Sequence, residues 1–395
     1  MRKTINPLKI SASTLVNALG VGKAHTIDAM TNSHSGLRNS KYPGMNFSTF
    51  LGLVDEVENV DLEDKLTRFD CRNNKLAKLA LDTDNFREEV DEAIVKYGKS
   101  RIGMFLGTST SGIAETENAY IDRDKRTGKL SDMNMLCTDN TGSVQRYVCR
   151  SLGLTGVSMV ISTACSSSAK VFASAYRSIE AGFCDAAIVG GVDSLCLTTL
   201  YGFNSLQLIS EDICQPWDKE RKGINIGEAA GFMLLEKSSD KIGVHLTGYG
   251  ESSDAYHISS PHPEGAGGKM AMECALSAAG IHASDIDYVN LHGTATPSND
   301  YSESRGLYSV FGSEIICSST KGMTGHTLGA AGINEAIICT LALENSIIPA
   351  NVNLKNIDDQ LPIQVVTKSM KKTLNHVMSN SFGFGGSNCS LIFSC

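Results

Sequence analysis

The stretch from residue 157 to 189 restricts the fold of this chain more than any other part of it. An apolar run from Val157 to Ile161 predicts a buried strand, and a helical pattern follows over residues 169–181. A second apolar run, Ala186 to Val189, predicts the next strand. Because strand, helix and strand at this spacing are typical of a βαβ crossover, we expect an α/β fold with a parallel sheet in this region.

A cysteine lies where the first of these strands turns into the helix. Cys165 stands between Thr163-Ala164 and Ser166-Ser167, whose small side chains leave room for a substrate. The unpaired N–H groups at the beginning of the helix favour a thiolate at this place. From these residues alone, both a reactive thiol and a buried structural cysteine stay open.

Length and charge narrow the class of protein. A chain of 395 residues exceeds what one simple core usually holds, which predicts two domains or a fused double-layer fold. The net charge of -8, without a long basic cluster, argues against a nucleic-acid-binding surface. The sequence has no signal-peptide pattern and no run near the ~18 apolar residues of a membrane span, so we expect a cytoplasmic protein without a span.

The cysteines raise the question of disulfides or a metal centre. There are 12, they form no CxxC pair, and most lie in apolar runs. This distribution is typical of reduced cysteines that serve as small apolar side chains in a cytosolic protein. We therefore expect no zinc site.

The pattern of strands and helices starts again after a polar segment at residues 237–242. Residues 286–291 predict a strand that opens into Gly293-Thr294-Ala295-Thr296. The strand before Cys165 likewise opens into a turn that contains Thr-Ala. Two apolar strands that end in similar turns indicate an internal duplication.

Other segments are expected to complete the fold. The loop 107–112, rich in Ser, Thr and Gly, follows a predicted strand at 102–106 and is either a ligand loop or a tight turn. Residues 113–155 predict helix, and 364–366 predict a short strand. The glycine-rich loop 381–388 can bring backbone N–H groups close to a ligand.

Two of the 9 histidines, His292 and His326, lie in Gly- and Thr-rich loops after predicted strands. Lys321 has the same kind of surroundings. Strand ends are where active-site residues of α/β sheets gather. Together with Cys165, these residues predict an acyl-transfer site with a nucleophile, electrophilic donors and electrostatic support.

Four segments, in the same order along the chain, resemble the active-site motifs of β-ketoacyl-[acyl-carrier-protein] synthases. They are Thr163–Ser167, His292–Pro297, Lys321–Gly332 and Asn380–Gly386. The resemblance covers essentially the whole chain. It implies a thiolase-like α/β fold, in which two similar halves form a five-layered αβαβα arrangement.

The resemblance also places the site residues in two halves. Residues 1–240 would carry the nucleophilic cysteine, and residues 241–395 would carry both histidines and Lys321. Among the departures from the family pattern, Gly322 stands where many relatives carry Ser, and Asn225 stands in a segment that is usually more apolar.

The resemblance implies a decarboxylating Claisen condensation. Cys165 would carry the acyl chain as a thioester, and the backbone N–H groups of Cys165 and Phe384 would form the oxyanion hole. His292 and His326 would donate hydrogen bonds to the enolate that forms when malonyl-acyl-carrier protein loses CO2. The product would be a 3-oxoacyl-acyl-carrier protein.

Further roles follow from the same resemblance. Lys321 would orient the site through ionic contacts, with Glu335 as its acidic partner unless that carboxylate is simply a solvated helix charge. Thr294 and Thr296 would bind the pantetheine arm, and Phe384 would act as a gate. The loop 107–112 and the segment 133–138 would line the acyl pocket, the latter across a dimer interface. No metal or cofactor is implied, because phosphopantetheine arrives with the substrate.

The family includes several pathways and partners. Arg72-Asn73-Asn74 and the loop 107–112 resemble the ketosynthases of bacterial aryl polyene clusters, which work with a catalytically dead chain-length factor. A fatty-acid role stays open beside that one. The expected partners are acyl-carrier protein and either a second copy of the chain or a chain-length factor.

Two other functions compete with condensation. A thiolase-type acyltransferase would need a second catalytic cysteine near the C-terminal glycine loop, and Cys389 follows that loop without the thiolase motif. A non-catalytic chain-length partner would lack the nucleophile, which Cys165 argues against.

Overall fold

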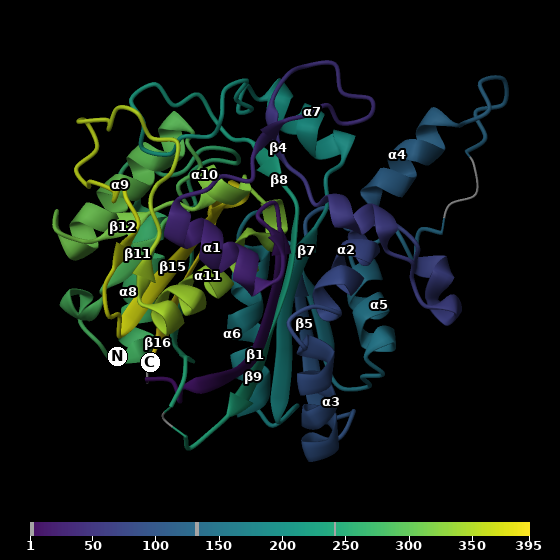
Figure 1. The fold of residues 1–395 in the computed structure, drawn as a ribbon, viewed down its shortest axis with the longest axis horizontal. Helices are drawn as coiled ribbons and strands as arrows, with labels where there is room; N and C mark the ends of the chain where they lie inside the picture. The colour runs from purple at the N-terminus through teal and green to yellow at the C-terminus, as the bar shows by residue number, and fades with distance from the viewer. Residues whose placement is uncertain (1–3, 131–133, 241) are drawn as a thin grey trace.

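The computed structural model describes residues 4–130, 134–240 and 242–395 (Figure 1). Its centre is an 11-stranded sheet in the order β6-β5-β7-β9-β1-β10-β16-β15-β11-β12, with β2 attached to β1. The strands of the first half are β1 (Leu8–Asn17), β5 (Ile102–Gly107), β6 (Ser158–Ile161), β7 (Ala186–Asp193) and β9 (Ala229–Lys237). Those of the second half are β10 (His245–Ser253), β11 (Tyr288–Asn290), β12 (Cys317–Ser318), β15 (His376–Gly383) and β16 (Ser387–Ser394).

The two halves of the sheet have the same topology. In the first, β5 pairs in parallel with β6 and β7, and β9 and β1 continue antiparallel. In the second, β11 pairs in parallel with β12 and β15, and β16 and β10 continue antiparallel. The halves meet where β1 pairs with β10. This symmetry is what an internal duplication predicts, whereas the division at residue 240 stays a prediction.

Helices form three layers around and between the halves (Figure 1). Helices α6 (Ser167–Glu180) and α11 (Ala331–Asn345) pack against each other in the central layer. One outer layer contains α2 (Arg72–Leu81), α3 (Phe86–Tyr97) and α5 (Ser143–Ser151), and the other contains α8 (Ala266–Ala279) and α9 (Pro297–Phe311). The fold is therefore the five-layered αβαβα arrangement that the sequence predicts.

The remaining elements are short or lie at the ends of the layers. The helices are α1 (Lys23–Asn32), α4 (Ile113–Ile121), α7 (Leu197–Ser205) and α10 (Lys321–Thr324). The strands are β2 (Gly20–Val21), β3 (Arg38–Asn39), β4 (Phe50–Gly52), β8 (Ile226–Gly227), β13 (Ile347–Ile348) and β14 (Met370–Lys371). Within the described residues, no helix combines the length and apolarity needed to cross a bilayer.

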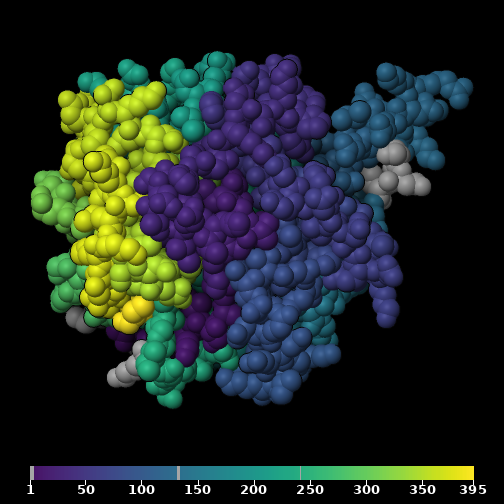
Figure 2. Space-filling model, viewed as in Figure 1, coloured from purple at the N-terminus to yellow at the C-terminus, as the bar shows by residue number. Residues whose placement is uncertain are grey.

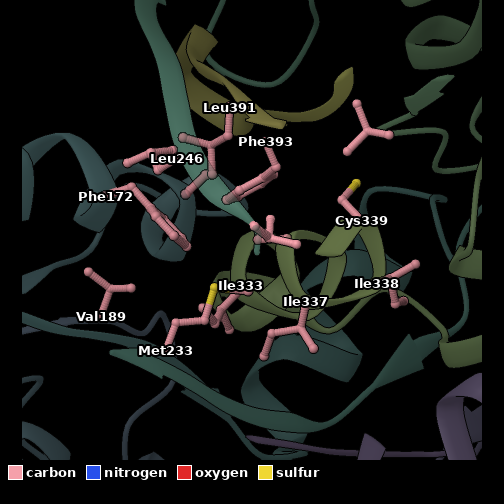
Figure 3. Close-up of a cluster of buried hydrophobic side chains, with 14 of the residues drawn as sticks. Phe172, Val189, Met233, Leu246, Ile333, Ile337, Ile338, Cys339, Leu391 and Phe393 are labelled. Atoms are coloured by element: carbon pink, nitrogen blue, oxygen red, sulfur yellow. The ribbon is translucent and has the colours of Figure 1, made fainter. Parts of the chain in front are cut away.

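Alternation along the strands divides the core between the layers. In β9, Met233 belongs to the central cluster of Figure 3, whereas the next-door side chain Phe232 belongs to the outer cluster under α2 and α3. Because successive side chains of a strand point to opposite faces, an apolar strand without polar alternation must be covered on both sides. Each fully buried side chain of this size contributes about 1.5–3 kcal/mol.

In the central layer, the first turns of α6 and α11 lie close together. A Cβ on Gly332, at the beginning of α11, would lie 2.4 Å from the backbone nitrogen of Ala169 in α6. Only glycine permits this close approach. The first turns of α6 and α11 are thereby held against each other.

Two predictions of secondary structure are wrong. Residues 113–155 are not one helical region, because α4 ends at Ile121 and α5 begins only at Ser143. Helix α4 and the residues that follow it, up to 130, project from the body (Figure 2). Among these residues, the Asp124 carboxylate accepts the N–H groups of Arg126 and Thr127, and this local turn competes with helix. Residues 364–366 form no regular strand, although Val366 donates to the carbonyl oxygen of Cys317 at 3.0 Å. Met133 of the predicted pocket segment lies outside the described residues.

Candidate active site

The turn between β6 and α6 presents Cys165. Ala164 has a left-handed backbone with φ of 53°, which turns the chain sharply just before the cysteine. The N–H of Thr163 donates to Ser167 Oγ at 2.9 Å, and that hydroxyl donates to the carbonyl oxygen of Ala164. These bonds hold the strained turn, so that the thiol lies at the base of a cavity and at the beginning of α6.

The Cys165 thiol is protonated in the resting site. Burial raises its pKa to about 11, although the positive charge of Lys321 and the backbone N–H groups of Phe384 and Cys165 act in the opposite direction. The N–H group at the helix end acts in the direction that the sequence predicts, but the desolvation of the thiol has the larger effect. The oxyanion hole formed by these two N–H groups stays a prediction.

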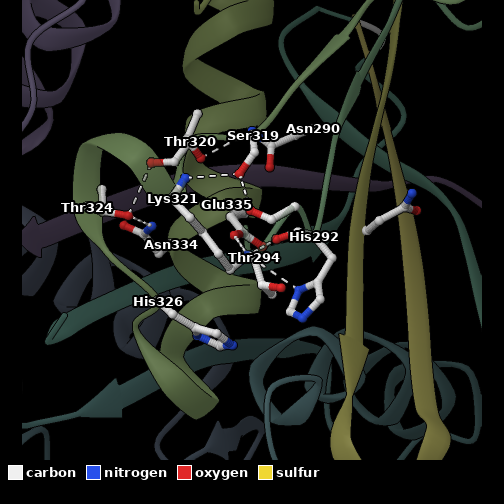
Figure 4. A network of polar contacts seen from close by, with 12 residues as sticks. Asn290, His292, Thr294, Ser319, Thr320, Lys321, Thr324, His326, Asn334 and Glu335 are labelled. Carbon is white, nitrogen blue, oxygen red and sulfur yellow. Dashed lines mark hydrogen bonds and ion pairs between the residues drawn. The ribbon is translucent and has the colours of Figure 1, made fainter. Parts of the chain in front are cut away.

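Both predicted histidines lie close to this thiol. They come from different loops (Figure 4). His292 follows β11 and His326 follows α10, and both are 2 % exposed. Their ring centroids are 5.4 Å apart with the planes at 87°. One nitrogen of each ring and Cys165 Sγ all lie within 4.8 Å of one another.

A hydrogen bond to the Nδ1 atom of each imidazole assigns its tautomer. The Lys321 ammonium lies 3.3 Å from His292 Nδ1 and can only donate to it. The backbone N–H of Leu328 donates to His326 Nδ1 at 3.1 Å. Burial, together with the charge of Lys321, holds the pKa of both histidines well below the usual range. Each ring is therefore neutral and carries its proton on Nε2, which faces the site as a donor.

By residue type, a cysteine and two histidines at this spacing resemble a metal site. A metal would need a lone pair on each ring nitrogen that faces the sulfur. The tautomers place N–H groups there instead, because both Nδ1 atoms already accept hydrogen bonds. The donor set fits an anionic oxygen and does not fit a metal ion.

Lys321 and Glu335 form a buried ion pair behind His292 (Figure 4). Each side chain is 1 % exposed, so Glu335 is not a solvated helix charge. Burial raises the pKa of Glu335 to about 7, with Lys321 acting in the opposite direction. The ammonium also donates to the carbonyl oxygen of His292. The pair therefore holds both the ring and the backbone of that histidine.

The structure adds a carboxylate that the sequence analysis missed. Glu303 in α9 accepts the N–H groups of His292 and Gly293, both at 2.8 Å. Asp300, one turn earlier in the helix, accepts from the N–H of Ala295 at 3.2 Å. They lie three residues apart in α9, which begins at Pro297, so both face the same side of the helix. Proline at a first helical position, followed by two acidic residues at this spacing, is a signal that could have found them.

The cavity that leads to Cys165 has a volume of about 60 Å³. Thr294 and Thr296 line it, and their hydroxyl oxygens are 2.9 Å apart. Phe384 lies at its wall with its ring centroid 5.5 Å from that of Phe203, a neighbour that the sequence did not indicate. The loop 107–112 is not among the lining residues of this cavity.

Comparison with known proteins identifies the family. Residues 80–241 match the N-terminal domain of β-ketoacyl synthases, and residues 244–355 match their C-terminal domain. The chain belongs to the β-ketoacyl synthase family. It is a condensing enzyme of the acyltransferase class.

This ketosynthase has relatives across its length. It is 34% identical to 3-oxoacyl-[acyl-carrier-protein] synthase 2 of Vibrio cholerae, over 92% of this chain and 93% of the relative. Identity to the enzyme of the same name from Staphylococcus aureus is 32%, over 86% and 89%. Among solved structures, the ketosynthase ApeO in complex with its chain length factor ApeC, from Xenorhabdus doucetiae, matches with a TM-score of 0.90 and 38% identity over 98% of both chains.

Two departures of this ketosynthase from its family pattern have local explanations. The carbonyl oxygen of Asn225 accepts the N–H of His326 at 2.7 Å, and its amide donates to Thr49 Oγ1 at 3.2 Å. Asn225 therefore braces the histidine loop. A Cβ on Gly322 would lie 2.9 Å from Val352 Cγ2, so a serine there would require the neighbouring chain to shift.

The Glu303 carboxyl makes the stability of the ketosynthase depend on pH. Burial raises its pKa to about 7, above the 4.5 of an ordinary Glu. Below pH 4.5 the group is protonated in both states, so its stabilising effect is full there and is lost as pH rises through 7. The lowered pKa values of His292 and His326 make stability rise with pH instead. The contribution of Glu303 is therefore measured as the difference in stability between the wild type and a Glu303 variant.

Between pH 5 and 7, the free energy of unfolding of the wild type should fall relative to Glu303→Gln, on the order of 2 kcal/mol. Urea unfolding at both pH values measures this difference. A difference that does not change with pH would show that Glu303 has the same proton affinity folded and unfolded.

Proposed function

We propose that this ketosynthase condenses an acyl thioester on Cys165 with malonyl-acyl-carrier protein and releases CO2 and a 3-oxoacyl-acyl-carrier protein. The observation that carries the proposal is the pair of neutral imidazoles, whose Nδ1 atoms accept hydrogen bonds and each of which has a ring nitrogen within 4.8 Å of the Cys165 sulfur. Two fixed donors at one point stabilise an oxygen that becomes negative during reaction.

In the first step, the thiol of Cys165 attacks the thioester of the acyl-carrier protein. The new S–C bond forms, the bond to the pantetheine sulfur breaks, and that sulfur leaves with the proton as a thiol. The N–H groups of Cys165 and Phe384 bind the tetrahedral oxyanion. Because the thiol is protonated at neutral pH, the proton leaves only as the acyl group arrives.

In the second step, a malonyl thioester enters past Thr294 and Thr296, whose hydroxyls suit the amides of the pantetheine arm. The C–C bond to the carboxylate breaks, and CO2 leaves its electron pair as an enolate. His292 and His326 donate to the enolate oxygen, and the enolate carbon attacks the Cys165 thioester. The bond between the acyl carbon and Cys165 Sγ breaks, the sulfur leaves as a thiolate that takes up one proton from water, and the acyl chain is two carbons longer.

We infer that Lys321 and Glu335 act on the site through His292 and take no part in bond formation. The ammonium holds His292 Nδ1 as an acceptor, and Glu335 forms an ion pair with that ammonium inside the protein. Phe384 would move aside when the acyl chain arrives, since Gly383 and Gly385 on either side leave its backbone free to turn.

The partners and pathway follow from the relatives. Because ApeO is solved with a chain length factor and is 38% identical, we propose that this chain forms a heterodimer of that kind. Its product would belong to the aryl polyene class, with fatty-acid elongation as the alternative that the synthase 2 relatives support. Substrates arrive on the phosphopantetheine of acyl-carrier protein, and the reaction needs no cofactor.

The competing functions have less support. Cys389 is 0% exposed and belongs to the central apolar cluster, so it is not available as the second nucleophile of a thiolase. A non-catalytic chain-length factor has no use for a cysteine surrounded by two histidines and an oxyanion hole.

Reconstitution tests the proposal. The chain, alone and with a candidate chain-length factor, is incubated with acyl- and malonyl-acyl-carrier proteins. We expect CO2 release in step with a carrier-bound product two carbons longer. Acyl exchange without CO2 release would overturn the proposed reaction and favour the thiolase-type alternative.

A further inference from the structure

The carboxylate of Asp193, at the end of β7, is the centre of a buried cluster. Asp193 is 0% exposed. Within the described residues, every group that donates a hydrogen bond to its carboxylate is neutral. Oδ1 accepts the N–H and hydroxyl of Thr110 at 2.9 and 2.8 Å, and the hydroxyl of Thr108 at 2.6 Å. Oδ2 accepts the hydroxyl of Ser109 at 2.7 Å and the N–H of Gly329.

These contacts join three segments that are far apart in the sequence. Asp193 ends β7, residues 108–110 follow β5, and Gly329 lies just before α11. The N–H of Ser109 also lies within 3.0 Å of both carboxylate oxygens. A charged carboxylate is costly to bury unless it accepts hydrogen bonds, and this one accepts many. An asparagine at this position would present an NH2 group to backbone N–H groups, which cannot accept a hydrogen bond from it.

The contact with Gly329 leads directly to a histidine of the site. Gly329 and His326 belong to one turn, in which Leu328 has a left-handed φ of 55°. In this turn, the N–H of Leu328 donates to His326 Nδ1, and the next N–H, that of Gly329, donates to Asp193. The carboxylate therefore anchors the turn that fixes the tautomer of His326.

The other side of the cluster leads to the nucleophile. A Cβ on Gly107, just before the 108–110 segment, would lie 2.3 Å from the backbone nitrogen of Ser168 in α6. Ser168 Oγ in turn accepts the N–H of Ile333 in α11 at 2.9 Å. The segment 107–110, whose residues 108–110 are bonded to Asp193, therefore packs against the first turn of α6, and α6 in turn is bonded to the first turn of α11.

We propose that Asp193 is a positioning residue of the condensation: it fixes the turn 326–329 so that the Leu328 N–H keeps His326 as the Nε2–H donor. The inference rests on the proposed function, since the donor matters only if an enolate forms. It acts through His326, so decarboxylation should depend on Asp193 more than transfer of the acyl group to Cys165 does.

The test separates the two half-reactions. In a Cys165→Gln background, whose carboxamide resembles an acylated thiol, release of CO2 from malonyl-acyl-carrier protein is measured with and without Asp193→Asn. Acylation of Cys165 is measured by intact-protein mass in the Asp193→Asn single variant. We expect CO2 release to fall about 100-fold. Acylation should fall by about threefold or less, because the oxyanion donors belong to other turns.

Glu228→Gln is the matched control. Glu228 is also 0% exposed and accepts the backbone N–H groups of Val54 and Leu195, at 2.8 and 3.2 Å. The Glu228 carboxylate differs from that of Asp193 in also pairing with the guanidinium of Arg72. Within the described residues, its hydrogen bonds include none to residues 326–329. Both half-reactions should then change by the same factor, as they would if Asp193 were only structural.

The tautomer of His326 gives a readout that needs no turnover. Imidazole 15N shifts of labelled protein should report the Nε2–H form of His326 in the wild type and a mixture with the Nδ1–H form in Asp193→Asn. An unchanged tautomer, or equal losses in both half-reactions, would overturn the role of Asp193. If the Cys165→Gln parent itself releases no CO2, the proposed function fails, and the tautomer still decides the inference.

Discussion

Replacing Cys165 by Ala is expected to abolish the acyl-enzyme and to reduce condensation by about 10⁴-fold or more. Among the described residues that line the cavity, Cys165 is the one cysteine, so the substitution removes the sulfur that would form the thioester. The fold should survive, because the change deletes one sulfur beside an open cavity. Intact-protein mass after incubation with acyl-acyl-carrier protein measures the loss directly.

Cys389→Ala is the control for this prediction. It also deletes a buried sulfur, but from the central apolar cluster, so it should cost stability of about 1 kcal/mol and leave acylation unchanged. A Cys165→Ala protein that still becomes acylated, or a Cys389→Ala protein that does not, would show that the nucleophile is assigned to the wrong cysteine.

His292→Ala is expected to lower decarboxylation by about 10²–10³-fold, the usual effect of one oxyanion donor. Transfer of the acyl group to Cys165 should continue, because that step uses the N–H groups of Cys165 and Phe384. Release of CO2 from malonyl-acyl-carrier protein and acylation of the protein, measured on the same preparation, give the two rates.

His34→Ala serves as the matched control, since the His34 side chain is 66% exposed and lies outside the cavity. It should change neither rate. Equal losses of both steps in His292→Ala would assign the histidine a structural role, and unchanged decarboxylation would remove its proposed role altogether.

The sequence is sufficient for the fold and for the residues that meet at the site. Strand–helix–strand spacing around Cys165 predicts that β6 and β7 run parallel, and the structure adds β5 between them as the strand with which both pair. The restart after residue 240 predicts the second half of the sheet. Lys321 and Glu335 follow from the family motif, and the structure gives them the expected contact.

What the sequence does not reveal depends on burial and on contacts between distant segments. The helix end at Cys165 suggests a thiolate, but the degree of desolvation that raises its pKa is a property of the whole fold. Glu303 and Asp193 act on loops that reach them only in three dimensions. The sequence does not reveal that the helix ends after Ile121, because the polar residues that follow are compatible with an exposed helix surface as well as with a turn.

A single-turnover experiment tests the central claim most directly. The wild type is loaded from acyl-acyl-carrier protein, freed of excess carrier, and then given malonyl-acyl-carrier protein, while the mass of the Cys165 peptide and the carrier products are followed. We expect the acyl mass on Cys165 to disappear as CO2 and a product two carbons longer form in equal amounts. Acyl mass on another residue, or its loss without a longer product, would contradict the account.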